Sequence, residues 1–120
     1  MKLTENFSTW EFDSPDRPGS GINMRIEFIF KLQEARRIAN IPFLITSGYR
    51  TKEHNEKVEG VKNSAHMVGK AADIACHTSI NRFRIVAALL EVKFTRIGIY
   101  ATYIHVDDDE SKSSEVIFLA

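Results

Sequence analysis

Apolar residues recur at helical spacing along the segment that follows Asn23. They stand at steps of three and four positions, the period of an amphipathic helix whose charged residues lie on the opposite face. Asn40 and Pro42 are typical of the end of such a helix. The apolar face predicted for it consists of Met24, Phe28, Leu32, Ala35 and Ala39.

A second amphipathic helix is predicted from about Ser79. Thr78 or Ser79 would cap it, because a hydroxyl oxygen there accepts a hydrogen bond from a free N–H of the first turn. The apolar face predicted for this helix consists of Phe83, Val86, Ala87 and Leu90.

Short β-rich runs make up the other apolar segments. The run at 43–46 leads into a polar loop from Ser47 to about Asn63, and a short buried strand is predicted at 71–75. The order of helices and strands predicts an α+β fold, a small single domain in which two main helices pack on an antiparallel sheet. The last three runs have the spacing of an antiparallel meander, and they are Phe94–Tyr100, Tyr103–Asp107 and Glu115–Leu119.

Residues 1–21 are rich in turn-forming residues, so we expect an irregular N-terminal arm. Phe7, Trp10 and Phe12 are expected to anchor this arm to the body of the domain, because aromatic side chains bury large apolar areas. An aromatic platform for a ligand is the alternative interpretation of these three residues.

The composition indicates one ordinary globular domain over residues 1–120, with 43% hydrophobic and 27% charged residues. Sixteen basic and sixteen acidic residues give a formal charge of zero. This balance lacks the electrostatic footprint of most nucleic-acid and anionic-membrane binders, so we expect neither partner. The sequence does not set the oligomeric state, and a monomer is favoured.

The N-terminal segment becomes polar at once. It lacks the apolar core, roughly 7–15 residues long, that a signal peptide requires. We therefore expect a protein that is synthesised in the cytoplasm without a signal peptide.

Two histidines and one aspartate are candidate metal ligands. His66 and Asp73 are seven positions apart, and His105 follows thirty-two positions after Asp73. Two imidazole nitrogens and one carboxylate oxygen give three ligands for a tetrahedral zinc ion and leave a fourth position for water. Cys76 is the one cysteine, which excludes the cysteine-rich zinc frameworks. Spacing alone leaves open a loop histidine, a capping aspartate and a histidine packed within a strand.

Four motifs follow one another along the chain: Ser47-Gly48-Tyr49-Arg50-Thr51, His54-Asn55, Ser64-Ala65-His66 through Gly69 to Ala72-Asp73-Ile74, and Ile104-His105-Val106-Asp107. In this order they resemble the zinc D-alanyl-D-alanine carboxypeptidase family. That family is similar, more distantly, to phage L-alanyl-D-glutamate endopeptidases, the D-alanyl-D-alanine dipeptidases of vancomycin resistance and the Hedgehog signalling domain. The resemblance runs from about Leu3 to Asp107, and residues 3–8 and 11–12 resemble the arm of small phage and bacterial members.

The resemblance implies a fold similar to Hedgehog and the D-Ala-D-Ala peptidases, and it assigns roles to particular residues. It implies that His66, Asp73 and His105 bind one Zn²⁺ ion. It also implies that Arg50 and Ser64 contact the substrate, the arginine at the scissile carbonyl or at a carboxylate. A guanidinium suits both tasks, because it binds a carboxylate bidentately and stabilises an oxyanion. Without the resemblance, Arg50 would be interpreted as a solvated surface charge.

One position departs from the pattern of this family. Several branches use an Asp or Glu three residues before the last histidine ligand as general base, and Thr102 stands there in this chain. A threonine does not accept a proton from water near neutral pH. Asp107 is the nearest replacement, because residues two apart on a strand face the same way, here with His105. Asp107 would act as the general base, or it would accept the free N–H of a ligand histidine and fix its tautomer.

Other polar residues receive weaker assignments. Tyr100 and Tyr103 are interpreted either as hydrogen-bond donors to an oxyanion or as packing residues. The acidic run 108–110 is expected to be a solvated turn, with an alternative general base as the second interpretation. His54 is expected near the cleft, and Gly69 is expected to serve the backbone through a tight approach or a positive φ.

These observations favour a zinc metallopeptidase that cleaves an amide bond in the stem peptides or cross-links of bacterial peptidoglycan. It would be a D-Ala-D-Ala carboxypeptidase or an endolysin-type endopeptidase. The resemblance to small phage members leads us to expect a phage or prophage protein that acts on the cell wall after release. The alternative is a non-catalytic zinc-binding domain that uses the same cleft to recognise a peptide or a protein, as the resemblance to Hedgehog implies.

Overall fold

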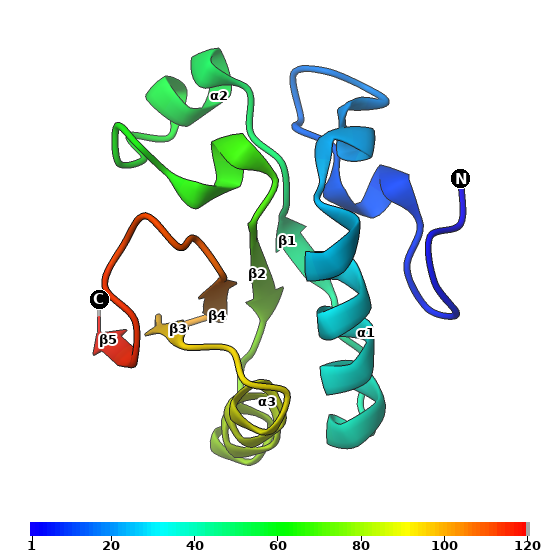
Figure 1. Cartoon of the computed structure of the whole chain (residues 1–120), viewed down its shortest axis with the longest axis vertical. Coiled ribbons are helices and arrows are strands. Elements are labelled where there is room, and N and C mark those ends of the chain that lie inside the picture. The colour runs from blue at the N-terminus through cyan, green and yellow to red at the C-terminus, as the bar shows by residue number, and fades with distance from the viewer. Residues whose placement is uncertain (120) are drawn as a thin grey trace.

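Three α-helices and a five-stranded sheet make up the fold of residues 1–119, which the computed structural model describes (Figure 1). This architecture confirms the predicted α+β class. Within residues 1–119 no helix combines the length and the apolar content needed to cross a membrane. The helices are α1 (Ile26–Ala39), α2 (Lys52–Lys57) and α3 (Ser79–Glu91). The strands are β1 (Ile45–Ser47), β2 (Ala71–Ala75), β3 (Arg96–Ile99), β4 (Tyr103–Asp107) and β5 (Val116–Leu119).

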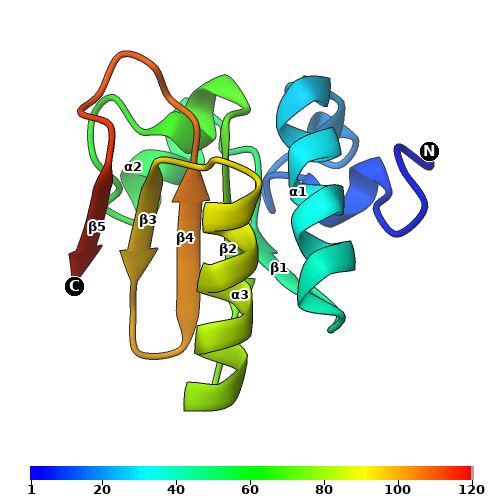
Figure 2. The ribbon, with the colours of Figure 1, turned by 60° about the horizontal axis from the view of Figure 1, so that its bottom comes forward.

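The sheet order is β1-β2-β4-β3-β5, and every neighbouring pair is antiparallel except β3 and β5. The prediction of an antiparallel meander is therefore wrong at its last step. Figure 2 shows the arrows of β3 and β5 pointing the same way, opposite to β4. The short turn at residues 100–102 forces β3 and β4 to be antiparallel, whereas residues 108–115 are long enough to return the chain to the start of β3. There the N–H of Val116 donates to the carbonyl of Thr95.

Helices α1 and α3 pack on one face of the sheet and enclose the core (Figure 2). Alternation along the strands directs the side chains of Ile74, Ile104 and Val106 to this face, and each is fully buried. All five residues of the apolar face predicted for the first helix are buried, which confirms this face, although Met24 lies two residues before the start of α1. The core is therefore the region in which periodicity determines the packing.

Helix α3 buries a different face from the one predicted. Its buried residues are Ile85, Ala88 and Leu89, whereas Phe83 is 76% exposed. The apolar residues of α3 cover two adjoining faces of the helix, and the face that carries Ile85 is the buried one, where α3 packs on α1 and β4. The predicted N-cap is confirmed, since the Thr78 side chain accepts a hydrogen bond from the Asn81 N–H.

The N-terminal arm contains two short 3-10 helices, η1 (Thr9–Phe12) and η2 (Ser20–Asn23). Phe7 and Phe12 anchor it as predicted, since both are buried and their rings meet edge to face at 5.5 Å. Trp10 does not, because its side chain is 69% exposed. The arm is fastened to the next loop by a hydrogen bond from the Tyr49 N–H to the Phe12 carbonyl.

The segment predicted as a polar loop contains helix α2. Thr51 caps this helix, because its side chain accepts a hydrogen bond from the His54 N–H. The Thr51 hydroxyl also donates to Asp16 at 2.6 Å, which ties the helix to the arm. Asn55 is buried in α2 although the segment is polar overall. Satisfied hydrogen bonds allow polar residues to be buried here.

Candidate metal centre

The second face of the sheet carries the candidate ligands. Asp73 on β2 lies directly opposite His105 on β4 in the strand register, so both side chains project from this face. His66 comes from the 3-10 helix η3 (Ala65–Val68), which precedes β2. Ser64 caps η3, since its hydroxyl accepts a hydrogen bond from the His66 N–H at 3.2 Å.

Gly69 lets the chain pass from η3 into β2. Its φ of +73° lies in the left-handed region that L side chains rarely adopt. A Cβ atom at this position would lie 2.2 Å from the carbonyl oxygen of Asn23. The predicted backbone role of Gly69 is therefore confirmed, and this turn sets His66 against Asp73.

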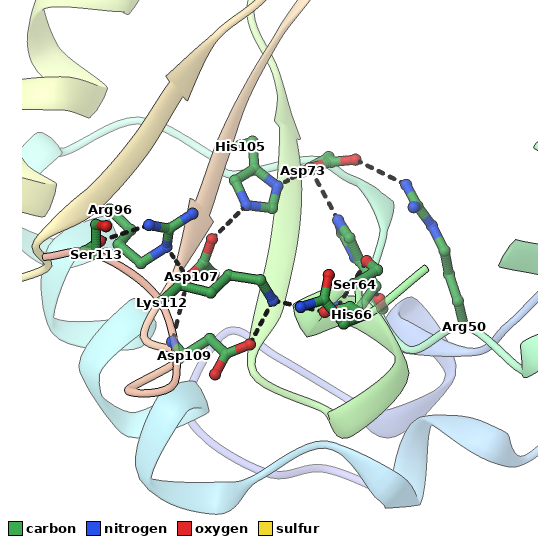
Figure 3. Close-up of polar contacts among 12 residues, drawn as sticks. Arg50, Ser64, His66, Asp73, Arg96, His105, Asp107, Asp109, Lys112 and Ser113 are labelled. Atoms are coloured by element: carbon green, nitrogen blue, oxygen red, sulfur yellow. Dashed lines mark hydrogen bonds and ion pairs between the residues drawn. The ribbon is translucent and has the colours of Figure 1, made fainter. Parts of the chain in front are cut away.

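The structure brings His66, Asp73 and His105 together. Asp73 Oδ1 lies 2.9 Å from His105 Nδ1 and 3.3 Å from His66 Nε2. One ligand atom from each of the three residues lies within 4.8 Å of the others. In Figure 3, Asp73 lies between His105 and Arg50, and His66 reaches it from a third direction.

The outer nitrogen of each imidazole is held by an oxygen. His66 Nδ1 lies 2.7 Å from the Gly48 carbonyl, and His105 Nε2 lies 2.7 Å from Asp107 Oδ2. A carbonyl and a carboxylate only accept hydrogen bonds, so these two ring nitrogens carry the protons. The inner nitrogens, His66 Nε2 and His105 Nδ1, face Asp73 Oδ1, and each offers a lone pair when a metal ion is bound. Without a metal, a proton on His105 Nδ1 donates to Asp73 instead, so these three atoms come together around a cation in either state.

The donor set fits a zinc ion. Bonds of about 2.0–2.1 Å in tetrahedral geometry separate neighbouring ligand atoms by roughly 3.4 Å. The distance of 3.3 Å between His66 Nε2 and Asp73 Oδ1 is close to this value, and the distance of 2.9 Å between His105 Nδ1 and Asp73 Oδ1 is shorter. Hydrogen-bonded outer nitrogens are also typical of histidines that bind metals. Cys76 is not part of the group, because its thiol is buried beside the Thr78 carbonyl.

The electrostatics of the site favour positive charge. Burial raises the pKa of Asp73, but hydrogen bonds from His105 and His66 outweigh it and hold the pKa well below its usual value. Burial lowers the pKa of His105, but hydrogen bonds to Asp107 and Asp73 outweigh it and raise the pKa. Both shifts have the same cause: carboxylates surround the imidazoles and attract a cation.

A cavity of about 550 Å³ opens beside these residues. Arg50 and Ser64 line one part of it, and an aromatic wall, defined as Tyr100, Tyr103 and Phe118, lines another. The two tyrosine rings are stacked with their centroids 4.4 Å apart. The Phe118 ring crosses Gly98, where a Cβ atom would lie 2.3 Å from it, and comes within 5.8 Å of the His105 ring.

Arg50 is fixed at the edge of the centre by weak polar contacts. Its Nε donates to Ser47 Oγ at 3.2 Å, and its Nη1 donates to Asn55 Oδ1 at 3.3 Å. Its Nη2 lies 3.5 Å from Asp73 Oδ2. Three of its five N–H groups are engaged among residues 1–119, so the guanidinium retains donors for a bound carboxylate or oxyanion.

Asp107 is 2% exposed, and both of its oxygens accept hydrogen bonds. Oδ2 accepts from His105, and Oδ1 accepts from Arg96 Nε at 2.8 Å and from the Asp109 N–H at 3.1 Å. Thr102 is exposed at the turn between β3 and β4 and does not line the cavity. The residue at the position of the usual family carboxylate therefore lies outside the site.

The expectation that His54 lies near the cleft is wrong. His54 lines a separate surface depression with Asp16 and does not reach the cavity beside the metal centre.

The acidic run 108–110 is only partly solvated, because Asp109 is 8% exposed and accepts hydrogen bonds from Lys112 and Ser111. These bonds hold the pKa of Asp109 at about 2, although burial opposes this shift. Polar partners in the same loop explain why Asp109 is buried, whereas Glu110 beside it is exposed.

Sequence reasoning missed Arg96, although a signal for it was present. The predicted strands end at Tyr100 and resume at Tyr103, which leaves a two-residue turn. Counting back from such a turn in an antiparallel hairpin pairs Arg96 with Asp107, and the structure has this register.

Comparison with known protein families gives one match. A family model described as Peptidase M15 matches residues 6–107. The matched range includes the arm from Asn6 onward, the three candidate ligands and Asp107, and it ends before β5. No curated protein sequence matches the chain.

Proposed function

The chain belongs to the peptidase M15 family, and from this premise we propose that it is a zinc peptidase that hydrolyses an amide bond in bacterial peptidoglycan. The bond would lie in a stem peptide or a cross-link, so the enzyme would be a D-Ala-D-Ala carboxypeptidase or an endolysin-type endopeptidase. The observation that carries the proposal is the convergence of His66, Asp73 and His105 at the edge of an open cavity.

His66 Nε2, His105 Nδ1 and Asp73 Oδ1 would hold the zinc ion. When bound, zinc supplies Lewis acidity and lowers the pKa of a bound water molecule to about 7. The protein's part is to keep the three ligand atoms oriented. The Gly48 carbonyl does this for His66, and the Asp107 carboxylate does it for His105.

Arg50 would bind the substrate at the oxygen that becomes negative. Its side chain lines the cavity and is only 15% exposed, which strengthens its interaction with a negative oxygen. In an exopeptidase the same guanidinium would instead hold the terminal carboxylate of the substrate. Ser64 would place its own hydroxyl beside the peptide, while that oxygen also caps η3.

Asp107 has two candidate roles in this reaction. As general base it would take the proton of the attacking water. As a positioning group it would only accept the N–H of His105. Its three hydrogen bonds support the second role, because a carboxylate whose two oxygens are occupied is less free to receive a proton.

A second candidate function is that of a non-catalytic zinc-binding domain that recognises a peptide in the same cavity. The observation that favours it is the pair formed by Thr102 and Asp107. Thr102 is exposed outside the cavity, and Asp107 is fully hydrogen-bonded. Such a domain would bind zinc and peptidoglycan fragments without cleaving them.

The test is mass spectrometry of purified peptidoglycan after incubation with the zinc-loaded protein, beside a His105→Ala control. Bound zinc is quantified in both proteins. New stem-peptide fragments that the control does not release, together with about one zinc ion per chain, would support the peptidase, and their masses would identify the bond. Bound zinc without new fragments would contradict the peptidase and support the recognition domain.

A further inference from the structure

Arg96 lies on β3, the strand that pairs with β4, which carries His105. It is paired with Asp107 in the register of β3 and β4, so both side chains project from the face that carries the ligands. The Arg96 side chain is 14% exposed, and its Nε donates to Asp107 Oδ1 at 2.8 Å. Its Nη1 donates to the Ser113 carbonyl, as Figure 3 shows.

We propose that Arg96 is a positioning residue of the metal centre, which acts through Asp107 to fix the orientation and the tautomer of His105. This inference rests on the proposed function, because it requires a metal ion held by His105. It adds a member to the site that none of the four sequence motifs contains.

Two hydrogen-bond donors fix the orientation of the Asp107 carboxylate. Arg96 Nε and the Asp109 N–H both donate to Asp107 Oδ1, which prevents the carboxylate from rotating. Oδ2 is therefore aimed at His105 Nε2, 2.7 Å away. With Nε2 held as the N–H, the other ring nitrogen of His105 keeps its lone pair directed at the ligand cluster.

The negative charge of Asp107 also requires a partner. Asp107 is 2% exposed, and a buried carboxylate needs a cationic or hydrogen-bonded partner to offset its desolvation. Arg96 supplies this cation and is not itself one of the three candidate metal ligands. Its guanidinium is itself held by Ser113 and lies 5.8 Å from the Phe118 ring. Ser113, in the connection to β5, therefore holds Arg96, Arg96 holds Asp107, and Asp107 orients His105.

Two other roles for Arg96 have to be distinguished from this one. Arg96 also lines the cavity, so it would touch the substrate directly in one alternative. In the other it only fastens the 108–115 loop through Ser113. Lys112 offers a matched control, because it fastens the same loop from the opposite side by donating to the Asn63 carbonyl at 2.6 Å. Its side chain makes no hydrogen bond to Asp107, and its second bond goes to the Asp109 carboxylate, not to the Asp109 N–H that Asp107 accepts.

The experiment is zinc competition against a chelator, in the absence of substrate, with the full chain. We expect Arg96→Met to weaken zinc binding about 5- to 10-fold, somewhat less than the 10- to 100-fold that loss of a direct partner of the ligand costs. Arg96→Lys should recover most of the affinity, because it keeps a cation beside Asp107. Lys112→Met should leave zinc affinity unchanged.

A double mutant tests whether Arg96 acts through Asp107. Arg96→Met combined with Asp107→Ala should bind zinc as Asp107→Ala alone does, because the relay is already broken. Circular dichroism checks that each variant is folded.

The outcomes separate the failure of this inference from that of the proposed function. Zinc binding by the wild type with no change in Arg96→Met would overturn the positioning role. Additive losses in the double mutant would overturn it as well. An increased KM with unchanged zinc affinity would make Arg96 a substrate contact instead. If the wild type binds no zinc, the proposed function itself fails.

Discussion

Strands β2 and β4 present two different surfaces on the two sides of the sheet. On the side covered by α1 and α3, Ile74, Ile104 and Val106 are all 0% exposed and belong to the apolar core. Asp73 and His105 each adjoin at least one of these core residues in sequence. On the open side their side chains face each other as a polar pair. A shift of one residue along either strand exchanges these two environments.

The difference between the two sides lies in what stabilises each. Burial of apolar area is non-directional, so the covered side depends on volume and tolerates the exchange of similar aliphatic residues. The open side depends on individual donor and acceptor atoms, because buried polar groups cost free energy unless they are paired. Substitutions on the covered side should therefore mainly change the free energy of unfolding, and those of the ligands and their partners on the open side should mainly change metal affinity.

Removal of a ligand should have the largest effect. We expect His105→Ala to weaken zinc binding by more than about 100-fold, because losing a partner of a ligand already costs 10- to 100-fold. Isothermal titration with zinc measures this loss. Ile104→Val, next to it on the covered side, is the control and should bind zinc as the wild type does. Equal affinity in wild type and His105→Ala would mean that zinc binds elsewhere.

The covered side is tested by Ile104→Ala. Loss of a fully buried aliphatic side chain should reduce the free energy of unfolding by about 2–5 kcal/mol, from lost burial and the cavity left behind. Urea denaturation of the metal-free protein measures the change. Under conditions in which Ile104→Ala remains folded, it should bind zinc with the affinity of the wild type. A large loss of zinc affinity at low urea would show that the two sides of the sheet are coupled.

Asp107→Ala sharpens the comparison within the open side. If Asp107 orients His105, zinc binding should weaken about 10- to 100-fold. If Asp107 is the general base, zinc affinity should persist while turnover falls about 10²- to 10⁴-fold. Zinc titration and peptidoglycan hydrolysis on the same preparation separate the two roles.

The smallest expected effect is a contribution of the open side to stability through Asp109. Its pKa of about 2 in the folded protein lies below the value of about 3.9 expected after unfolding. The carboxylate therefore stabilises the fold above about pH 4, and this contribution is lost as the pH falls toward 2. Asp109→Asn should reduce the free energy of unfolding by about 1 kcal/mol at pH 7, after allowance for solvent screening. Denaturation of both proteins at pH 7 and pH 3 should show the difference shrinking, and a difference that grows toward pH 3 would contradict this account.

Periodicity predicts the covered side well. The buried face of α1 and the bounds of β2 follow from the sequence, because one apolar stripe and one short apolar run admit a single solution. Helix α3 has apolar residues on two adjoining faces, so the pattern alone does not decide between Phe83 and Ile85. Tertiary packing on α1 and β4 decides, since it buries the face of Ile85. The parallel pairing of β5 likewise depends on where the 108–115 connection crosses the sheet.

The open side required more than periodicity. Spacing alone left His66, Asp73 and His105 with structural interpretations, and the ordered motifs brought them together as candidate ligands. Arg96 lies outside these motifs, and hairpin register is the signal that places it opposite Asp107. Contacts between segments far apart in sequence, such as the Gly48 carbonyl with His66, could not be predicted, because they depend on how η3 meets β1.

The central claim, that the open side of the sheet holds a zinc ion through two histidines and one aspartate, is tested most directly by X-ray absorption spectroscopy at the zinc edge. The account predicts two imidazole ligands with the remaining ligands oxygen, at about 2.0–2.1 Å, and no sulfur. His66→Ala should reduce the imidazole count to one. A sulfur ligand at about 2.3 Å, or an imidazole count that does not respond to His66→Ala, would contradict it.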